Sequence, residues 1–97
     1  MFRALPKTEE ARILGRQVLR SGTAVAANYR SACRARSRPD LISKIGITVE
    51  EADETVFWLE LIVDAGIIKK SKLESLMAEA NELVRIFQAT RTTARSR

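Results

Sequence analysis

The feature that most restricts the fold is the apolar periodicity in the last third of the chain. Between Ser71 and Thr92, apolar side chains recur at alternating steps of three and four residues, the spacing of one face of an α-helix. The seam consists of Leu73, Leu76, Ala80, Leu83 and Phe87, with Thr90 continuing the spacing and Met77, Val84 and Ile86 widening it. Ser71 also opens an S-K-L-E pattern typical of a helix start. The sequence predicts a helix over about 71–92 and a frayed polar tail at 93–97.

Two further helices are expected before it. Thr8 can cap a helix whose first turn is acidic, and this helix is predicted over about 8–36. Ser37 can cap a second helix, predicted over about 39–65 and stopped by Gly66. The 97 residues contain only four Gly and two Pro, and no stretch alternates with the period of a strand. Because the connections are short, neighbouring helices should lie antiparallel. We therefore expect one all-α domain, residues 1–97, folded as an antiparallel up-and-down bundle.

The residue types present argue against catalysis. The chain has no His and one cysteine, Cys33. It therefore lacks the commonest general base, the Ser–His and Cys–His nucleophile pairs, and the ligands of a Cys/His metal site. We expect no cofactor. Cys33 lies among small residues and is expected to be buried. Glu50 and Glu54 are the remaining acid–base pair, and ion pairing with arginine explains them more simply. With no signal-peptide core and no membrane-length apolar run, we expect a cytoplasmic protein that is not an enzyme.

Charge is distributed in blocks along the chain. Residues 1–44 hold ten Lys or Arg and three Asp or Glu, whereas residues 45–68 hold six acidic residues and no Lys or Arg. Residues 69–97 are basic again, with seven Lys or Arg and three acidic residues. Such blocks can neutralise one another when helices pack antiparallel, and they can also steer a polyanion to the basic segments.

The first predicted helix carries a stripe of arginines. If it is continuous past Gly22 and Thr23, where a kink is possible, the stripe spans about 80° of arc at 3.6 residues per turn. Its members are Arg12, Arg16, Arg20, Arg30, Arg34 and Arg38. Tyr29 falls on the opposite, apolar side, and a polar line of Gln17, Ser21 and Asn28 lies at the edge of that side. Two interpretations remain open: the stripe faces the phosphates of RNA or DNA, or it is a solvated face partly paired with glutamates of the second helix.

The second predicted helix is apolar on two sides. One stripe, which includes Ile45, Val49 and Leu59, is suited to the core. A different face carries the candidate residues for an oligomer contact, which are Ile47, Glu50, Glu54, Trp58 and Leu61. A helix with two apolar faces is either central in its own fold or covered by a partner. Trp58 could accordingly anchor a subunit contact or pack inside the subunit.

Three motifs give the chain a resemblance to a known family. They are the R-Q-V-L-R-S-G-T-A-V-A-A-N-Y-R stretch at Arg16–Arg30, the D-L-I-S-K-I-G stretch at Asp40–Gly46, and the E-E-A-D-E-T-x-x-W-L-E-L pattern at Glu50–Leu61. Over roughly residues 5–92 the chain resembles the 23S rRNA intervening-sequence protein family. The resemblance implies a small four-helix bundle that assembles as a ring of five. It also implies similarity to the accessory proteins of diversity-generating retroelements, which bind a reverse transcriptase and nucleic acid.

The chain departs from the family pattern at its start. The family's first helix precedes the L-P-K-T-E turn, and here Met1–Ala4 resembles only the last turn of that helix. We therefore expect three of the four helices, with the first one missing or truncated. The expected function is a non-catalytic homo-oligomer that binds nucleic acid, or an enzyme acting on it, through basic surfaces. The alternative is a structural or protein-interaction module in which arginines pair with glutamates across helices or subunits.

Overall fold

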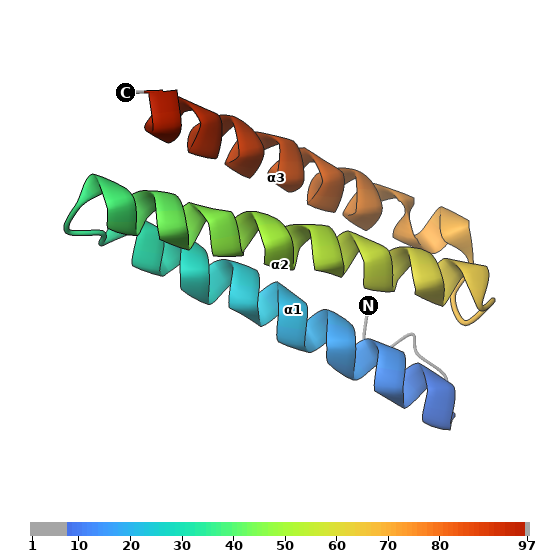
Figure 1. Cartoon of the computed structure of the whole chain (residues 1–97). Coiled ribbons are helices and arrows are strands. Elements are labelled where there is room, and N and C mark those ends of the chain that lie inside the picture. Colours follow the sequence, from blue (N-terminus) through green and yellow to red (C-terminus); the bar gives the residue numbers. More distant parts are fainter. Residues whose placement is uncertain (1–7, 97) are drawn as a thin grey trace.

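Three long helices make up the part of the chain that the structure, a computed structural model, describes, residues 8–96. They are α1 (Glu9–Cys33), α2 (Arg38–Asp64) and α3 (Lys70–Ser96), and these residues contain no strand. The prediction of an all-α fold is confirmed. Figure 1 shows α2 lying between α1 and α3, with the chain turning back at each of the two short connections. The described chain measures 46 × 20 × 16 Å, so the helices span its whole length.

The starts of α1 and α2 follow from local capping. The Thr8 hydroxyl accepts a hydrogen bond from the backbone N–H of Ala11 at 3.1 Å, which satisfies one of the free donors of α1. Ser37 accepts in the same way from Asp40 at 3.2 Å, and Pro39 sits in the first turn of α2, where its missing N–H costs nothing. Gly66, with a φ of 73°, follows α2 in the left-handed conformation that glycine adopts without strain.

Two predicted boundaries are wrong. The first helix ends at Cys33 and not near residue 36, because Ser37 must be extended to cap α2 and residues 34–36 are needed to reverse the chain. The third helix continues to Ser96, so residues 93–96 are not a frayed tail. The neighbouring helix holds this last turn: Ala94 is buried, and its carbonyl accepts a hydrogen bond from Arg38 Nε at 2.8 Å.

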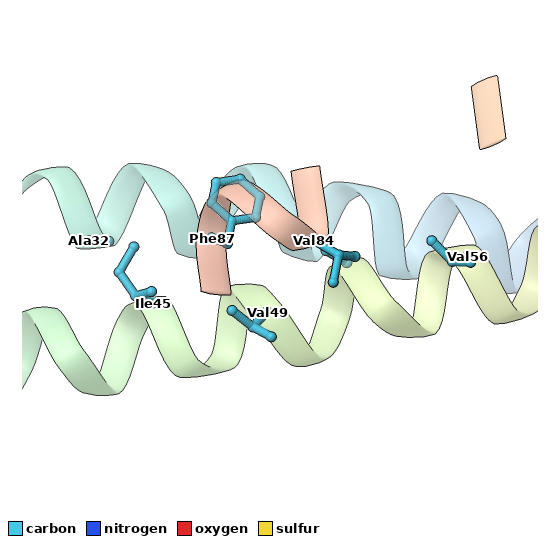
Figure 2. Close-up of a cluster of buried hydrophobic side chains, with 7 residues drawn as sticks. Ala32, Ile45, Val49, Val56, Val84 and Phe87 are labelled. Carbon is cyan, nitrogen blue, oxygen red and sulfur yellow. The ribbon is translucent and has the colours of Figure 1, made fainter. Parts of the chain in front are cut away.

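The core forms two apolar clusters on either side of the middle of α2. One joins Ala32 of α1 and Ile45 and Val49 of α2 to Val84 and Phe87 of α3 (Figure 2). The other joins Leu14 and Val18 of α1 and Leu59 and Ile62 of α2 to Leu73 of α3. Every helix contributes to both clusters, but α2 supplies the largest apolar side chains that are almost completely excluded from solvent, Ile45, Leu59 and Ile62. Of the two explanations for a helix with two apolar faces, the structure shows that α2 is central in its own fold.

A groove separates α1 from α3. Each of these helices packs on α2, whereas contacts between them are sparse. One such contact is the Tyr29–Phe87 ring pair, whose centroids lie 5.4 Å apart. The groove has a volume of about 520 Å³, and its lining includes Leu19, Gly22, Ala26, Thr55, Leu76 and Leu83.

Two other expectations concern single segments. Cys33 was expected to be buried and is exposed, because the residue that faces α2 in the last turn of α1 is its neighbour Ala32. The helix continues without a break through Gly22, and the Thr23 hydroxyl donates to the carbonyls of Leu19 and Arg20. The expected remnant of a missing helix, Met1–Ala4, lies outside the described residues. Among the helices of residues 8–96, none is long and apolar enough to cross a membrane.

Candidate functional site

The six arginines of the predicted stripe do not share one helix. Arg12, Arg16, Arg20 and Arg30 lie on α1, whereas Arg34 is its C-cap and Arg38 is the first residue of α2. The prediction of a single continuous stripe is therefore wrong for the last two arginines. Helix α1 ends before Arg34 and the chain then reverses direction, so both arginines lie at the loop that joins α1 to α2.

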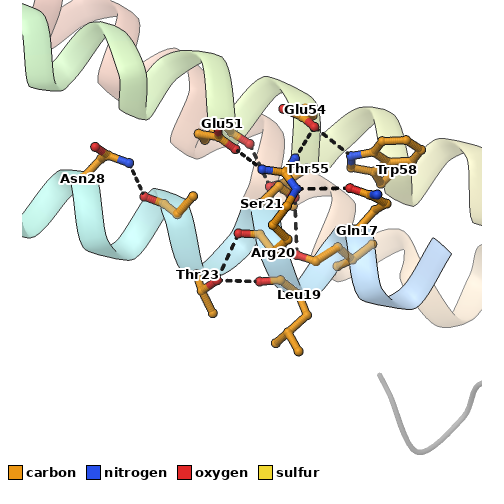
Figure 3. A network of polar contacts seen from close by, with 12 residues as sticks. Gln17, Leu19, Arg20, Ser21, Thr23, Asn28, Glu51, Glu54, Thr55 and Trp58 are labelled. Atoms are coloured by element: carbon orange, nitrogen blue, oxygen red, sulfur yellow. Dashed lines mark hydrogen bonds and ion pairs between the residues drawn. The ribbon is translucent and has the colours of Figure 1, made fainter. Parts of the chain in front are cut away.

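Arg20 is held in an ion-pair network with α2. One Nη donates to Glu51 at 3.4 Å and the other pairs with Glu54, while Nε donates to the Gln17 side chain at 3.1 Å (Figure 3). Glu54 also accepts a hydrogen bond from Trp58 Nε1 at 3.2 Å. Arg20 thus follows the alternative interpretation, in which an arginine pairs with the glutamates of the second helix.

The polar line at the edge of the apolar face of α1 supports this network. Ser21 is completely buried, and its hydroxyl accepts a hydrogen bond from the Thr55 hydroxyl of α2 at 2.9 Å. Asn28 donates to the carbonyl of Ala24 on its own helix. Ser21 and Thr55 therefore tie α1 to α2 beside the ion pairs, a contact that a helical wheel of α1 alone does not reveal.

The other arginines of the set have different surroundings. Arg12 pairs with Glu9 one turn away, with both side chains more than half exposed. Arg16, Arg30 and Arg34 are exposed and have no carboxylate within ion-pair distance among residues 8–96. Arg38 donates to a backbone carbonyl, as described above. Four of the six arginines therefore keep a positive charge that no carboxylate of this part of the chain offsets.

One end of the bundle concentrates positive charge. The last turn of α1, the loop, the start of α2 and the end of α3 meet there (Figure 1). Residues 30–44 and 88–96 hold seven Lys or Arg and one acidic residue, Asp40, a balance of +6. The basic residues are Arg30, Arg34, Arg36, Arg38, Lys44, Arg91 and Arg95. We call these seven residues the loop-end cluster.

The rest of the described chain is not basic. At the opposite end, residues 8–16 and 56–76 hold five basic and five acidic residues, which balance. The middle, residues 17–29, 45–55 and 77–87, holds two basic and six acidic residues, a balance of −4. In the folded bundle, the charge along the long axis is therefore positive at the loop end, negative in the middle and balanced at the opposite end. Sequence reasoning missed Arg36, Lys44, Arg91 and Arg95, and the last two reach this end of the bundle only because α3 runs back along α2.

The candidate residues for an oligomer contact lie on the face of α2 that neither α1 nor α3 fully covers. Ile47 and Glu50 are exposed, whereas Glu54, Trp58 and Leu61 are half-buried. Trp58 and Leu61 pack against the cluster around Leu59, so Trp58 has an internal contact as well as an open side. Phe57 is 51% exposed and stacks edge-on against Trp58 with centroids 5.0 Å apart. Phe57 adds an aromatic ring to this face that was not among the candidates.

Tyr29 is near the loop-end cluster and is half exposed, although it was assigned to the apolar side of α1. A side-chain hydrogen bond with Cys33 raises the pKa of the Tyr29 phenol above its ordinary value of 10.0. Within residues 8–96, no group of three or more His, Cys, Asp or Glu side chains could hold a metal ion.

Comparison with known proteins supplies the family. The sequence model of the 23S rRNA-intervening sequence protein family matches residues 1–89, nearly the whole chain. The chain belongs to this family. A crystal structure of a protein of unknown function from the S23 ribosomal protein family, from Bacteroides thetaiotaomicron, has a TM-score of 0.78 and is 37% identical. That match covers 81% of this chain and 73% of the other. A search of curated proteins finds no match. The family resemblance seen in the sequence is therefore confirmed.

Proposed function

We propose that this member of the family is a non-catalytic, cytoplasmic assembly protein that binds nucleic acid through a basic surface. The observation that supports the proposal is the loop-end cluster, where Arg30 and Arg34 are exposed and have no carboxylate partner among residues 8–96. Arginine pairs with phosphate through two parallel hydrogen bonds, and unpaired arginines are free to do so. In a cell, the partner is RNA or DNA, or a complex of nucleic acid with an enzyme such as a reverse transcriptase.

The proposal includes self-association. The second apolar face of α2, on which Ile47 and Phe57 are exposed and Trp58 is half-buried, supports a homo-oligomer, and the family resemblance suggests a pentamer. We also propose that the family fold is an antiparallel up-and-down bundle in which a fourth helix covers the groove between α1 and α3. Light scattering across a dilution series tests the assembly, and a well-folded monomer at micromolar concentration would contradict it.

Filter binding tests the nucleic-acid interaction. The protein should retain RNA or DNA at low salt, with an affinity that falls steeply as salt rises, because each neutralised phosphate releases a counterion. Replacing Arg30 and Arg34 with Gln should reduce the slope of log K against log salt by roughly 0.7–0.9 for each lost contact. The size of the oligomer should not change. Failure of the unmodified protein to bind at low salt would refute the proposal.

A second candidate rests on a different observation. The contacts of Arg20 with Glu51 and Glu54 favour a structural interaction module in which arginines pair with glutamates between helices or subunits. Under this alternative the Arg30 and Arg34 substitutions should loosen the assembly, and nucleic acid should bind poorly to the unmodified protein. The same filter-binding and sizing measurements therefore separate the two functions.

A further inference from the structure

We propose that the loop end of the bundle binds an unpaired nucleotide, with phosphates on the loop-end cluster and the base in the apolar hollow beside Arg38. This inference rests on the proposed nucleic-acid function and specifies which part of the strand is bound. Two observations support it: a concentration of positive charge, and a hollow of about 710 Å³ at the same end of the molecule.

The hollow lies where the start of α2 meets the end of α3. Its lining includes Arg38 and Leu41 from α2 and Ile86, Ala89, Thr90 and Ala94 from α3. Ile86 is 48% exposed, so the hollow opens to solvent and presents an apolar wall to it. Its volume is in the range of about 300–1,000 Å³ that is usual for small-molecule sites. A planar base fits such a surface, whereas the phosphates of a strand do not.

Arg38 supplies the connection between the hollow and the charge. Its Nε donates to the Ala94 carbonyl at 2.8 Å, which anchors the side chain at the wall of the hollow. No carboxylate within residues 8–96 lies at ion-pair distance from its Nη groups. Unstacked bases are commonly recognised by stacking on arginine planes or aromatic rings. An anchored guanidinium can provide a plane of this kind without losing much side-chain freedom on binding.

The charge of the loop end exceeds what the helix ends require. The C-termini of α1 and α3 both lie there, and each carries the equivalent of roughly half a negative charge from its backbone dipoles. Arg30 and Arg95 lie in those last turns and offset that charge. The balance of +6 leaves several charges beyond this role, among them the exposed Arg34 and Arg36. A nearby anion is therefore favoured, and a strand carries one for each nucleotide.

The first experiment varies the strand and leaves the protein unmodified. Fluorescence anisotropy compares a single-stranded oligothymidylate of about 20 nucleotides with a strand of equal length whose sugars lack bases. Both carry the same phosphates, so a purely electrostatic surface binds them equally. Base stacking in the hollow should make the normal strand bind about fivefold or more tightly at matched salt. An oligoribothymidylate of the same length differs from the oligothymidylate only in its 2′-hydroxyl groups and shows whether the sugar affects binding. Preferential binding of either normal strand over the abasic strand supports the inference.

The second experiment changes the hollow. Ile86→Asn should reduce the affinity for the normal strand by about fivefold and leave the affinity for the abasic strand unchanged. Ile13→Asn is the matched control, because Ile13 is 47% exposed and lies near the opposite end of α1. Sedimentation of both variants shows whether the hollow is instead covered by a second copy of the chain. Dissociation caused by Ile86→Asn without an effect on strand binding would overturn the inference.

The third experiment changes the charges. Replacing Arg34 and Arg36 with Gln should lower the single-strand salt slope by about 1.4, at about 0.7 for each lost phosphate contact. Replacing Arg12 and Arg16 with Gln removes the same charge from the opposite end and should leave the slope nearly unchanged. Equal effects of the two pairs would overturn the placement at the loop end.

The outcomes separate this inference from the proposed function. If the strands with and without bases bind equally, the inference fails while the proposed function stands. If neither binds at low salt, both fail. The comparison of strands needs no variant, so it decides the question even if a substitution prevents folding.

Discussion

Replacing Arg20 with Gln tests whether the ion-pair network contributes to stability. Arg20 Nη1 lies 3.4 Å from Glu51, and Arg20 also pairs with Glu54. The Arg20 side chain is 47% exposed, and those of Glu51 and Glu54 are 21% and 38% exposed. Ion pairs this exposed contribute about 0.2–1 kcal/mol each, because water screens them and long side chains lose freedom. Without Arg20, the acidic middle also loses one of its two basic residues. We expect a loss of about 1 kcal/mol in unfolding free energy.

Salt provides the assay. Urea unfolding at low ionic strength should show the full loss, which corresponds to a fall of about 4–8 °C in melting temperature for a domain of this size. In 1 M NaCl the Debye length is about 3 Å, so most of the difference between Arg20→Gln and the unmodified protein should disappear. A double-mutant cycle with Glu54→Gln isolates the pair, because the second substitution should cost less when Arg20 is already absent.

Arg16→Gln is the matched control, since Arg16 is exposed on the same helix and has no carboxylate partner among the described residues. Its stability should change by less than about 0.5 kcal/mol. The electrostatic explanation would be refuted if the loss from Arg20→Gln persisted in 1 M NaCl, or if Arg16→Gln were equally costly. The contact would then matter through packing of the arginine stem.

Three other predictions follow from burial and backbone geometry. Ile62→Ala should cost about 2–5 kcal/mol in urea unfolding, because Ile62 is completely buried, whereas Ile13→Ala, at 47% exposure, should cost less than about 1 kcal/mol. Gly46→Ala should stabilise the protein by about 0.5–1 kcal/mol, since a Cβ at this helical position meets nothing within 4 Å. Gly66→Ala should destabilise it by about 1–2 kcal/mol, because Gly66 has a φ of 73° that alanine adopts only with strain. Melting temperatures that moved in the same direction would contradict this. Iodoacetamide should modify Cys33 without denaturant, as mass spectrometry would show, and protection until unfolding would mean that the thiol is covered.

The helices could be predicted from the sequence because their signals are local. Apolar periodicity, the caps Thr8 and Ser37, and the stop at Gly66 each depend on neighbours within one or two turns. The errors lie where a distant segment decides the outcome. The sequence around residues 93–96 is polar and predicts fraying, but Arg38, more than fifty residues away, binds the Ala94 carbonyl and Ala94 is buried.

The candidate site shows the same limit. The spacing predicted six arginines on one face of one helix. This holds only for the arginines within α1, because α1 ends before Arg34 and Arg38 belongs to α2. Whether an arginine meets a glutamate or solvent depends on the register between α1 and α2. Arg20 pairs with Glu54, whereas Arg16, one turn earlier, is exposed to solvent. The spacing of the arginines in the sequence does not predict this difference.

The position of α2 between two helices that scarcely contact each other determines how the molecule can open. If α3 detaches, the interface of α1 with α2 persists, and if α1 detaches, that of α2 with α3 persists. Opening α2 requires the loss of both interfaces. Its amides around Ile45, Leu59 and Ile62 should therefore exchange with deuterium only through global unfolding, while those of α1 and α3 exchange through smaller openings of lower free energy. In this bundle, α1 or α3 can detach separately while α2 stays packed against the other helix.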